Sequence, residues 1–106
     1  MEKTDRIRAL NDAFRTRMVG GQLLLTQGIA GRPDTEEILS KVAGFSEFSE
    51  DNDPHGEHDF GAFEHGSDTL FWKIDYYSRD LQAGSEDPAD PAVTTRVLTV
   101  MLAPEY

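Results

Sequence analysis

The side chains of this sequence that could do chemistry are concentrated in residues 51–61, which read DNDPHGEHDFG. The segment combines acidic and imidazole side chains with one proline and two glycines. Loops of this composition are often functional, because a rigid scaffold can present their side chains together. His58 could act there as a general base oriented by Glu57 or Asp59. Asp75, which we expect on a neighbouring strand, could supply a second carboxylate for the same site.

Two histidines of this segment could instead bind a divalent transition metal. His55 and His58 are three residues apart, with Glu57 between them, and imidazole and carboxylate groups are common ligands of such ions. A third ligand would have to come from elsewhere, and Asp75 and His65 are the nearest candidates. The spacing alone predicts no firm metal site, and we expect no cofactor.

The same residues could serve only to shape the loop. Asp53 and Asp59 would then accept backbone hydrogen bonds in turns, and His58 would bond a carboxylate. The rest of the sequence adds no catalytic signature. Its serines lie in no nucleophile-elbow pattern, and it has neither a phosphate-binding glycine loop nor a dinucleotide fingerprint. A non-catalytic function is therefore favoured.

Charge indicates what kind of partner the protein has. The 106 residues include 20 Asp and Glu against 10 Lys and Arg, a formal net charge of −10. Residues 34–90 alone hold 16 acidic and 3 basic side chains, so the acidity is localised. Such a segment argues against direct binding to nucleic acid or to an anionic membrane. It is typical of a solvated face or of a surface for a basic partner, with the following candidate binding residues: Glu47, Glu50, Asp51 and Asp53.

The cysteine content and the distribution of apolar residues further limit the class of protein and its expected location. The sequence has no cysteine, which excludes disulfides, thiolate zinc sites, iron–sulfur clusters and a cysteine nucleophile. The first residues form no apolar core of signal-peptide length, and no stretch approaches the roughly 20 apolar residues of a membrane span. We therefore expect a cytoplasmic protein with no membrane association.

The first half of the chain predicts two helices and a short strand. Apolar residues recur at near-helical spacing from Ile7 to Met18, before Gly20 stops the helix. The other face of this helix carries arginines that we expect to be solvated: Arg6, Arg8, Arg15 and Arg17. A strand is expected over residues 22–26. The second helix follows Pro33, with Asp34 and Glu37 at the spacing of a capping box.

The second half predicts three strands. Residues 60–65 and 69–77 flank a Gly-Ser-Asp turn and read as a hairpin, with Trp72 and its alternate neighbours on one buried face. Residues 96–102 are nearly continuously apolar, as in a central strand. The order predicts one α+β domain over residues 1–106, a small antiparallel sheet of about four strands with two helices packed on one face.

Several strings in the sequence carry a family resemblance: IRALND near the start, NDPHGEHDFG, WKIDYY, and the segment from Gly84-Ser85 through Asp90-Pro91 to RVLT. Together they resemble a small bacterial family, the domain of unknown function 3768. The resemblance covers nearly the whole chain. It implies a complete bacterial family member of this length, and it implies no activity, substrate or catalytic residue.

These observations support two hypotheses. The first is a small acidic accessory protein that contacts a basic or nucleic-acid-handling protein. An inhibitor that mimics nucleic acid, with carboxylates in a partner's phosphate-binding groove, is one form of it. The alternative is a metal-dependent or acid–base enzyme that uses residues 51–61 and Asp75. Convergence of His58, Asp59 and Asp75 in one cleft would separate the two.

Overall fold

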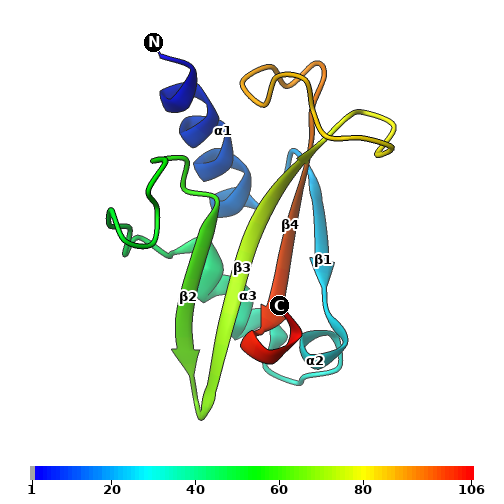
Figure 1. The fold of residues 1–106 in the computed structure, drawn as a ribbon. Coiled ribbons are helices and arrows are strands. Elements are labelled where there is room, and N and C mark those ends of the chain that lie inside the picture. Colours follow the sequence, from blue (N-terminus) through cyan, green and yellow to red (C-terminus); the bar gives the residue numbers. More distant parts are fainter. Residues whose placement is uncertain (1) are drawn as a thin grey trace.

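The computed structural model describes residues 2–106, which form three α-helices, four strands and a short 3-10 helix (Figure 1). In chain order these elements are α1 (Lys3–Arg17), β1 (Gln22–Leu25), α2 (Gln27–Ala30), α3 (Thr35–Ala43), β2 (Phe60–His65), β3 (Asp68–Tyr77), β4 (Thr95–Leu102) and the 3-10 helix (Ala103–Glu105). The α+β class and the hairpin are confirmed. The single turn of α2 was not expected, so the described residues hold three helices where two were predicted.

The sheet is mixed, and the prediction of a purely antiparallel sheet was wrong. Its strand order is β1-β4-β3-β2, and both β2–β3 and β3–β4 pair in the antiparallel direction. β1 runs parallel to β4, with Gln22 opposite Val97 and Leu25 opposite Val100. A tight turn forces β2 and β3 to be antiparallel, but two helices and the hairpin separate β1 from β4. The local sequence therefore does not determine the direction of β1.

The alternation of β3 places its apolar residues in the core. Trp72 has no exposed surface, as the sequence predicted, and Leu70 and Ile74 lie beside it. The core cluster combines residues of β3 and β4 with residues of all three helices: Phe14, Ile29, Ile38, Val42, Leu70, Trp72, Ile74, Leu98 and Val100. Lys73, Asp75 and Tyr77 alternate with these β3 residues and so point away from the core.

Arg15 is not part of a solvated face, contrary to expectation. Its side chain is buried against Phe48 and Trp72, and its Nη1 donates hydrogen bonds to carbonyl oxygens at the end of α3. The acceptors are Val42 at 2.8 Å and Phe45 at 3.0 Å, together with Ala43 at 3.2 Å. A helix end leaves carbonyl groups without partners, so this arginine caps α3 and joins it to α1.

The beginning of α3 also differs from the prediction. Asp34 is the residue before the helix, but its side chain makes no capping hydrogen bond. Its carboxylate accepts instead from Arg32, at 2.9 and 3.0 Å, and contacts Nε2 of His65 at 2.8 Å. These hydrogen bonds hold the pKa of Asp34 well below its usual range. The expected capping box is therefore replaced by a link from α3 to the end of β2.

No helix in residues 2–106 combines the length and the apolar character that a membrane crossing requires.

Candidate functional site

The segment predicted to carry chemistry lies against α1. Nδ1 of His58 lies 2.9 and 3.1 Å from the two carboxylate oxygens of Asp12, and the imidazole stacks on Phe48 with ring centroids 3.7 Å apart. Its Nε2 lies 3.7 Å from a carboxylate oxygen of Asp53. His58 has a positive φ of 54°, a conformation that costs energy for a side chain of this kind. The contacts with α1 and Phe48 stabilise this conformation.

Glu57 is also joined to the body of the protein. The hydroxyl of Tyr76 donates to the Glu57 carboxylate at 2.7 Å, and Nδ2 of the buried Asn11 donates to the Tyr76 hydroxyl at 2.8 Å and to the Glu57 carbonyl at 3.0 Å. Nε of Arg96 completes the network by donating to Oδ1 of Asn11 at 2.7 Å. Burial raises the pKa of Tyr76 far above its ordinary value, and the hydrogen bond to Glu57 makes the second-largest contribution. Tyr76 is therefore a fixed hydrogen-bond donor.

Turns built from side chains hold the rest of the loop. Oδ1 of Asn52 accepts the backbone N–H of Ser49 at 2.8 Å, and its Nδ2 donates to the Glu47 carbonyl at 2.8 Å. Asp53 is buried, with 9% of its surface exposed, and accepts the backbone N–H of His58 at 3.2 Å. Asp53 was predicted as a binding residue of the acidic surface, but it is buried beneath that surface.

Asp59 has the perturbed acidity that an acid–base group would need. Burial, together with the nearby charge of Glu57, raises the pKa of its carboxyl above the ordinary value. Its expected partner is turned elsewhere, because the imidazole of His58 contacts Asp12. The pair His58–Asp59 that the sequence suggested is thus replaced by the pair His58–Asp12.

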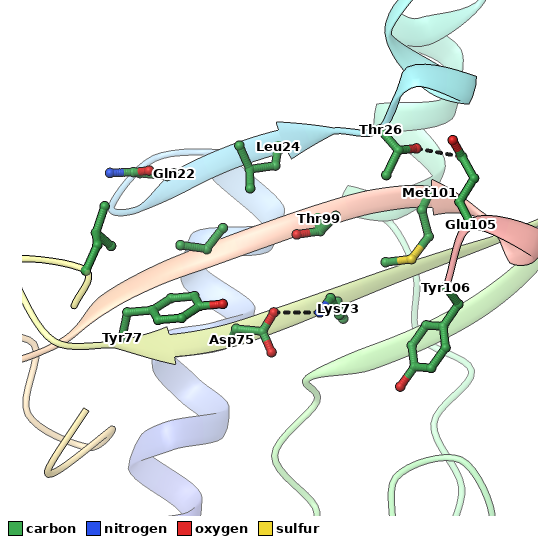
Figure 2. A pocket seen from close by; sticks show the side chains of 12 residues that line it. Gln22, Leu24, Thr26, Lys73, Asp75, Tyr77, Thr99, Met101, Glu105 and Tyr106 are labelled. Carbon is green, nitrogen blue, oxygen red and sulfur yellow. Dashed lines mark hydrogen bonds and ion pairs between the residues drawn. The ribbon is translucent and has the colours of Figure 1, made fainter. Parts of the chain in front are cut away.

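Asp75 lies at a different place. It points away from the core and lines a hollow of about 630 Å³ on the outer side of the sheet, where it pairs with Lys73 at 2.9 Å (Figure 2). The side chains that line the hollow come from β1, β3 and β4 and from the residues that follow each of these strands: Gln22, Leu24, Thr26, Lys73, Asp75, Tyr77, Leu81, Val97, Thr99, Met101, Glu105 and Tyr106. None of them belongs to residues 51–61, so His58, Asp59 and Asp75 do not converge in one cleft.

Two charged side chains of this hollow, those of Lys73 and Glu105, are held in their ordinary ionised states. The hydrogen bond to Asp75 raises the pKa of Lys73, which therefore stays an ammonium group at neutral pH. The hydroxyl of Thr26 and two backbone N–H groups lower the pKa of Glu105, which stays a carboxylate. A fixed ammonium and a fixed carboxylate bind groups by charge but exchange protons poorly. The hollow is thus better suited to binding than to proton transfer. Of its features, the sequence predicted only that these β3 residues face away from the core.

The histidines are dispersed. His55 is exposed, His58 contacts Asp12, and His65 lies between Asp34 and Lys41 at the other end of β2. Across residues 2–106 there is no group of three or more His, Cys, Asp or Glu side chains that could hold a metal ion. The described part of the chain therefore provides no ligand set for the metal hypothesis.

Three of the predicted binding residues lie on the surface of the loop. Glu47, Glu50 and Asp51 are exposed. Within residues 2–106, their carboxylates take part in none of the ion pairs or side-chain hydrogen bonds. These three carboxylates are thus available to an external partner.

Comparison with known proteins gives one match. A family model described as "Protein of unknown function (DUF3768)" matches residues 4–105. No curated protein and no solved structure matches the chain.

Proposed function

The chain belongs to the DUF3768 family, and from this premise we propose that it is a non-catalytic binding protein of the cytoplasm that contacts a basic protein partner. The contact surface is the acidic loop, which we define by the exposed residues Glu47, Glu50 and Asp51. One observation carries the proposal. These carboxylates have no internal partners within residues 2–106, although the loop beneath them is tied down by many.

Order in the loop favours binding. The backbone N–H of Asp53 donates to the Ser49 carbonyl at 2.8 Å, and Asn52 bridges the same turn. His58 then fixes the end of the loop to Asp12. A surface that is ordered before it meets its partner loses less conformational entropy on binding. The acidic loop therefore resembles a prepared contact surface more than a mobile solubilising segment.

The charge of the acidic loop indicates the chemistry of the partner. Three carboxylates that form no ion pair within residues 2–106 produce a negative potential that attracts a basic surface and accelerates association. A protein that handles nucleic acid has such a surface. In the inhibitory form of the proposal, the carboxylates occupy the positions that phosphate groups would take.

Support for a non-catalytic function comes from the use of the candidate catalytic groups. The Glu57 carboxylate accepts a hydrogen bond from Tyr76, and the His58 imidazole contacts Asp12. Asp75 forms an ion pair with Lys73 on another face of the protein. An acid–base mechanism needs two such groups within reach of one substrate. Around the loop, the side chains of Glu57 and His58 contact groups of the protein itself, which supports a non-catalytic function.

The experiment compares two triple variants with equal loss of charge. Glu47→Gln/Glu50→Gln/Asp51→Asn removes the acidic loop, and Glu36→Gln/Glu37→Gln/Glu86→Gln removes three exposed acids that make no ion pair within residues 2–106. Each immobilised protein captures partners from a lysate of the source organism at low and high salt. The proposal expects a basic protein that the wild type and the control retain at low salt and that the loop variant loses. Equal capture by both variants would contradict it.

A further inference from the structure

Three arginines line a second hollow, which we call the arginine groove. It has a volume of about 290 Å³ and lies between the last turns of α1 and the segment that joins β3 to β4. In Figure 1 this segment extends, in yellow and orange, beyond the ends of both strands. The arginines are Arg17, Arg79 and Arg96, and the remaining lining is mainly apolar: Leu10, Ala13, Phe14, Val19, Gly20, Pro91 and Thr94. Within residues 2–106, no acidic residue lines the groove.

Arg96 is a buried cation that forms no ion pair with the other described residues. Only 4% of its surface is exposed, and its hydrogen bonds go to neutral oxygens, the side chain of Asn11 and the carbonyl of Pro88. The ring of Tyr76 lies 5.2 Å from its guanidinium carbon. The negative charge of Glu57 favours the charged form of Arg96. The Glu57 carboxylate nevertheless accepts its hydrogen bond from Tyr76 and not from Arg96. Burial lowers the pKa of Arg96, because taking a charge out of water costs free energy. A bound anion would offset this cost.

The other two arginines are exposed and also unpaired. Neither Arg17 nor Arg79 forms an ion pair within residues 2–106. Arg79 donates only a long hydrogen bond of 3.4 Å, to the Pro91 carbonyl. The chain has twice as many acidic as basic side chains. Three arginines among the residues that line one hollow, with no acid among that lining within residues 2–106, therefore depart from the charge pattern of the whole molecule.

We propose that the arginine groove binds the phosphate group of a small phosphate ester. Guanidinium groups donate paired hydrogen bonds to phosphate oxygens and remain charged at physiological pH. A phosphate monoester offers three oxygens and close to two negative charges, whereas a carboxylate offers two oxygens and one charge. Phosphate therefore matches three arginines better. The apolar walls formed by Leu10, Phe14 and Val19 would contact the organic part of the ester.

The test is a titration of the full chain with phenyl phosphate, followed by NMR of the backbone amides. We expect shifts concentrated at Arg17, Val19, Arg79 and Thr94. Benzoate at matched ionic strength supplies the carboxylate counterpart, and we expect it to bind at least 10-fold more weakly. Equal binding of benzoate would overturn the assignment to phosphate, and shifts spread over the whole surface would overturn the site.

Single variants connect the binding to the groove. Arg17→Gln and Arg79→Gln replace exposed side chains and should leave the fold intact while weakening phenyl phosphate binding at least 10-fold. Arg6→Gln is the matched control, because Arg6 is an exposed arginine of α1 outside the groove. The proposal is wrong if Arg17→Gln and Arg6→Gln bind phenyl phosphate with the same affinity as the wild type.

Discussion

The imidazole Nδ1 of His58 lies 2.9 Å from a carboxylate oxygen of Asp12, although 46 residues separate them in the sequence. This contact joins the loop that precedes β2 to the first helix of the protein. The ring of Phe48, which belongs to the same loop and packs edge-on against Trp72, covers the imidazole. A residue type that is common in active sites here holds the loop of the proposed binding surface in place.

His58→Ala should therefore destabilise the protein and loosen the loop. It removes a hydrogen bond to a charged group and an aromatic stacking partner, and together these contribute about 1–3 kcal/mol. Urea unfolding measures the loss, and hydrogen exchange should become faster in residues 45–59. His55→Ala is the control, because His55 is exposed, and it should change neither quantity. Equal effects of both variants would show that the contact with Asp12 contributes nothing.

Gly61 should tolerate no side chain. A Cβ at this position would lie 2.3 Å from Nε1 of Trp72 and 2.9 Å from the Phe45 ring, and crowding of a packed core costs about 1–3 kcal/mol. We expect Gly61→Ala to lower the melting temperature by several degrees. Gly31→Ala is the control, since it is the same substitution at another glycine. A Cβ at Gly31 would meet nothing within 4 Å, so this variant should not lower the melting temperature. If Gly61→Ala melts at the wild-type temperature, the approach of β2 to Trp72 is looser than described.

Asp59→Asn should stabilise the protein at neutral pH. The folded state raises the pKa of this carboxyl through burial, so folding favours the protonated form, and the free energy of unfolding falls as the pH rises through the raised pKa. Asparagine cannot ionise and avoids that loss. We expect the free energy of unfolding of Asp59→Asn to exceed that of the wild type by a margin that grows as the pH rises from about 4 to 8, as measured by unfolding curves at each pH. Asp51→Asn, at an exposed position, should stay within about 0.5 kcal/mol of the wild type. A destabilised Asp59→Asn protein at neutral pH would mean that the ionised carboxylate makes a favourable contact.

Much of the fold was predictable because it depends on local patterns. The period of two in β3 identified Trp72 as buried and Asp75 as outward-facing, and both assignments agree with the structure. The parallel direction of β1 was not predictable, since its partner β4 follows some 70 residues later. The burial of Arg15 was also missed, because its acceptors lie at the end of another helix.

The candidate site was predictable as a segment but not as a geometry. The composition of residues 51–61 singled out the loop, yet the partners of His58 and Glu57 come from α1 and β3. Spacing within the segment says nothing about such distant partners. The arginine groove left no sequence signal either, because Arg17, Arg79 and Arg96 are far apart in the chain and only the fold brings them to one hollow.

The most direct test of the proposed function is the association rate constant with the captured basic partner, measured from low to high ionic strength. At 0.1 M salt, interactions between exposed charges are largely screened beyond about 10 Å, so such charges accelerate association mainly below that salt concentration. We predict that Glu47→Gln/Glu50→Gln/Asp51→Asn associates several-fold more slowly than the wild type at low salt and shows a weaker salt dependence. The control Glu36→Gln/Glu37→Gln/Glu86→Gln should stay close to the wild type. Identical rates for the two triple variants at every salt concentration would contradict the account, because the acidic loop would then contribute no more than any other exposed acids.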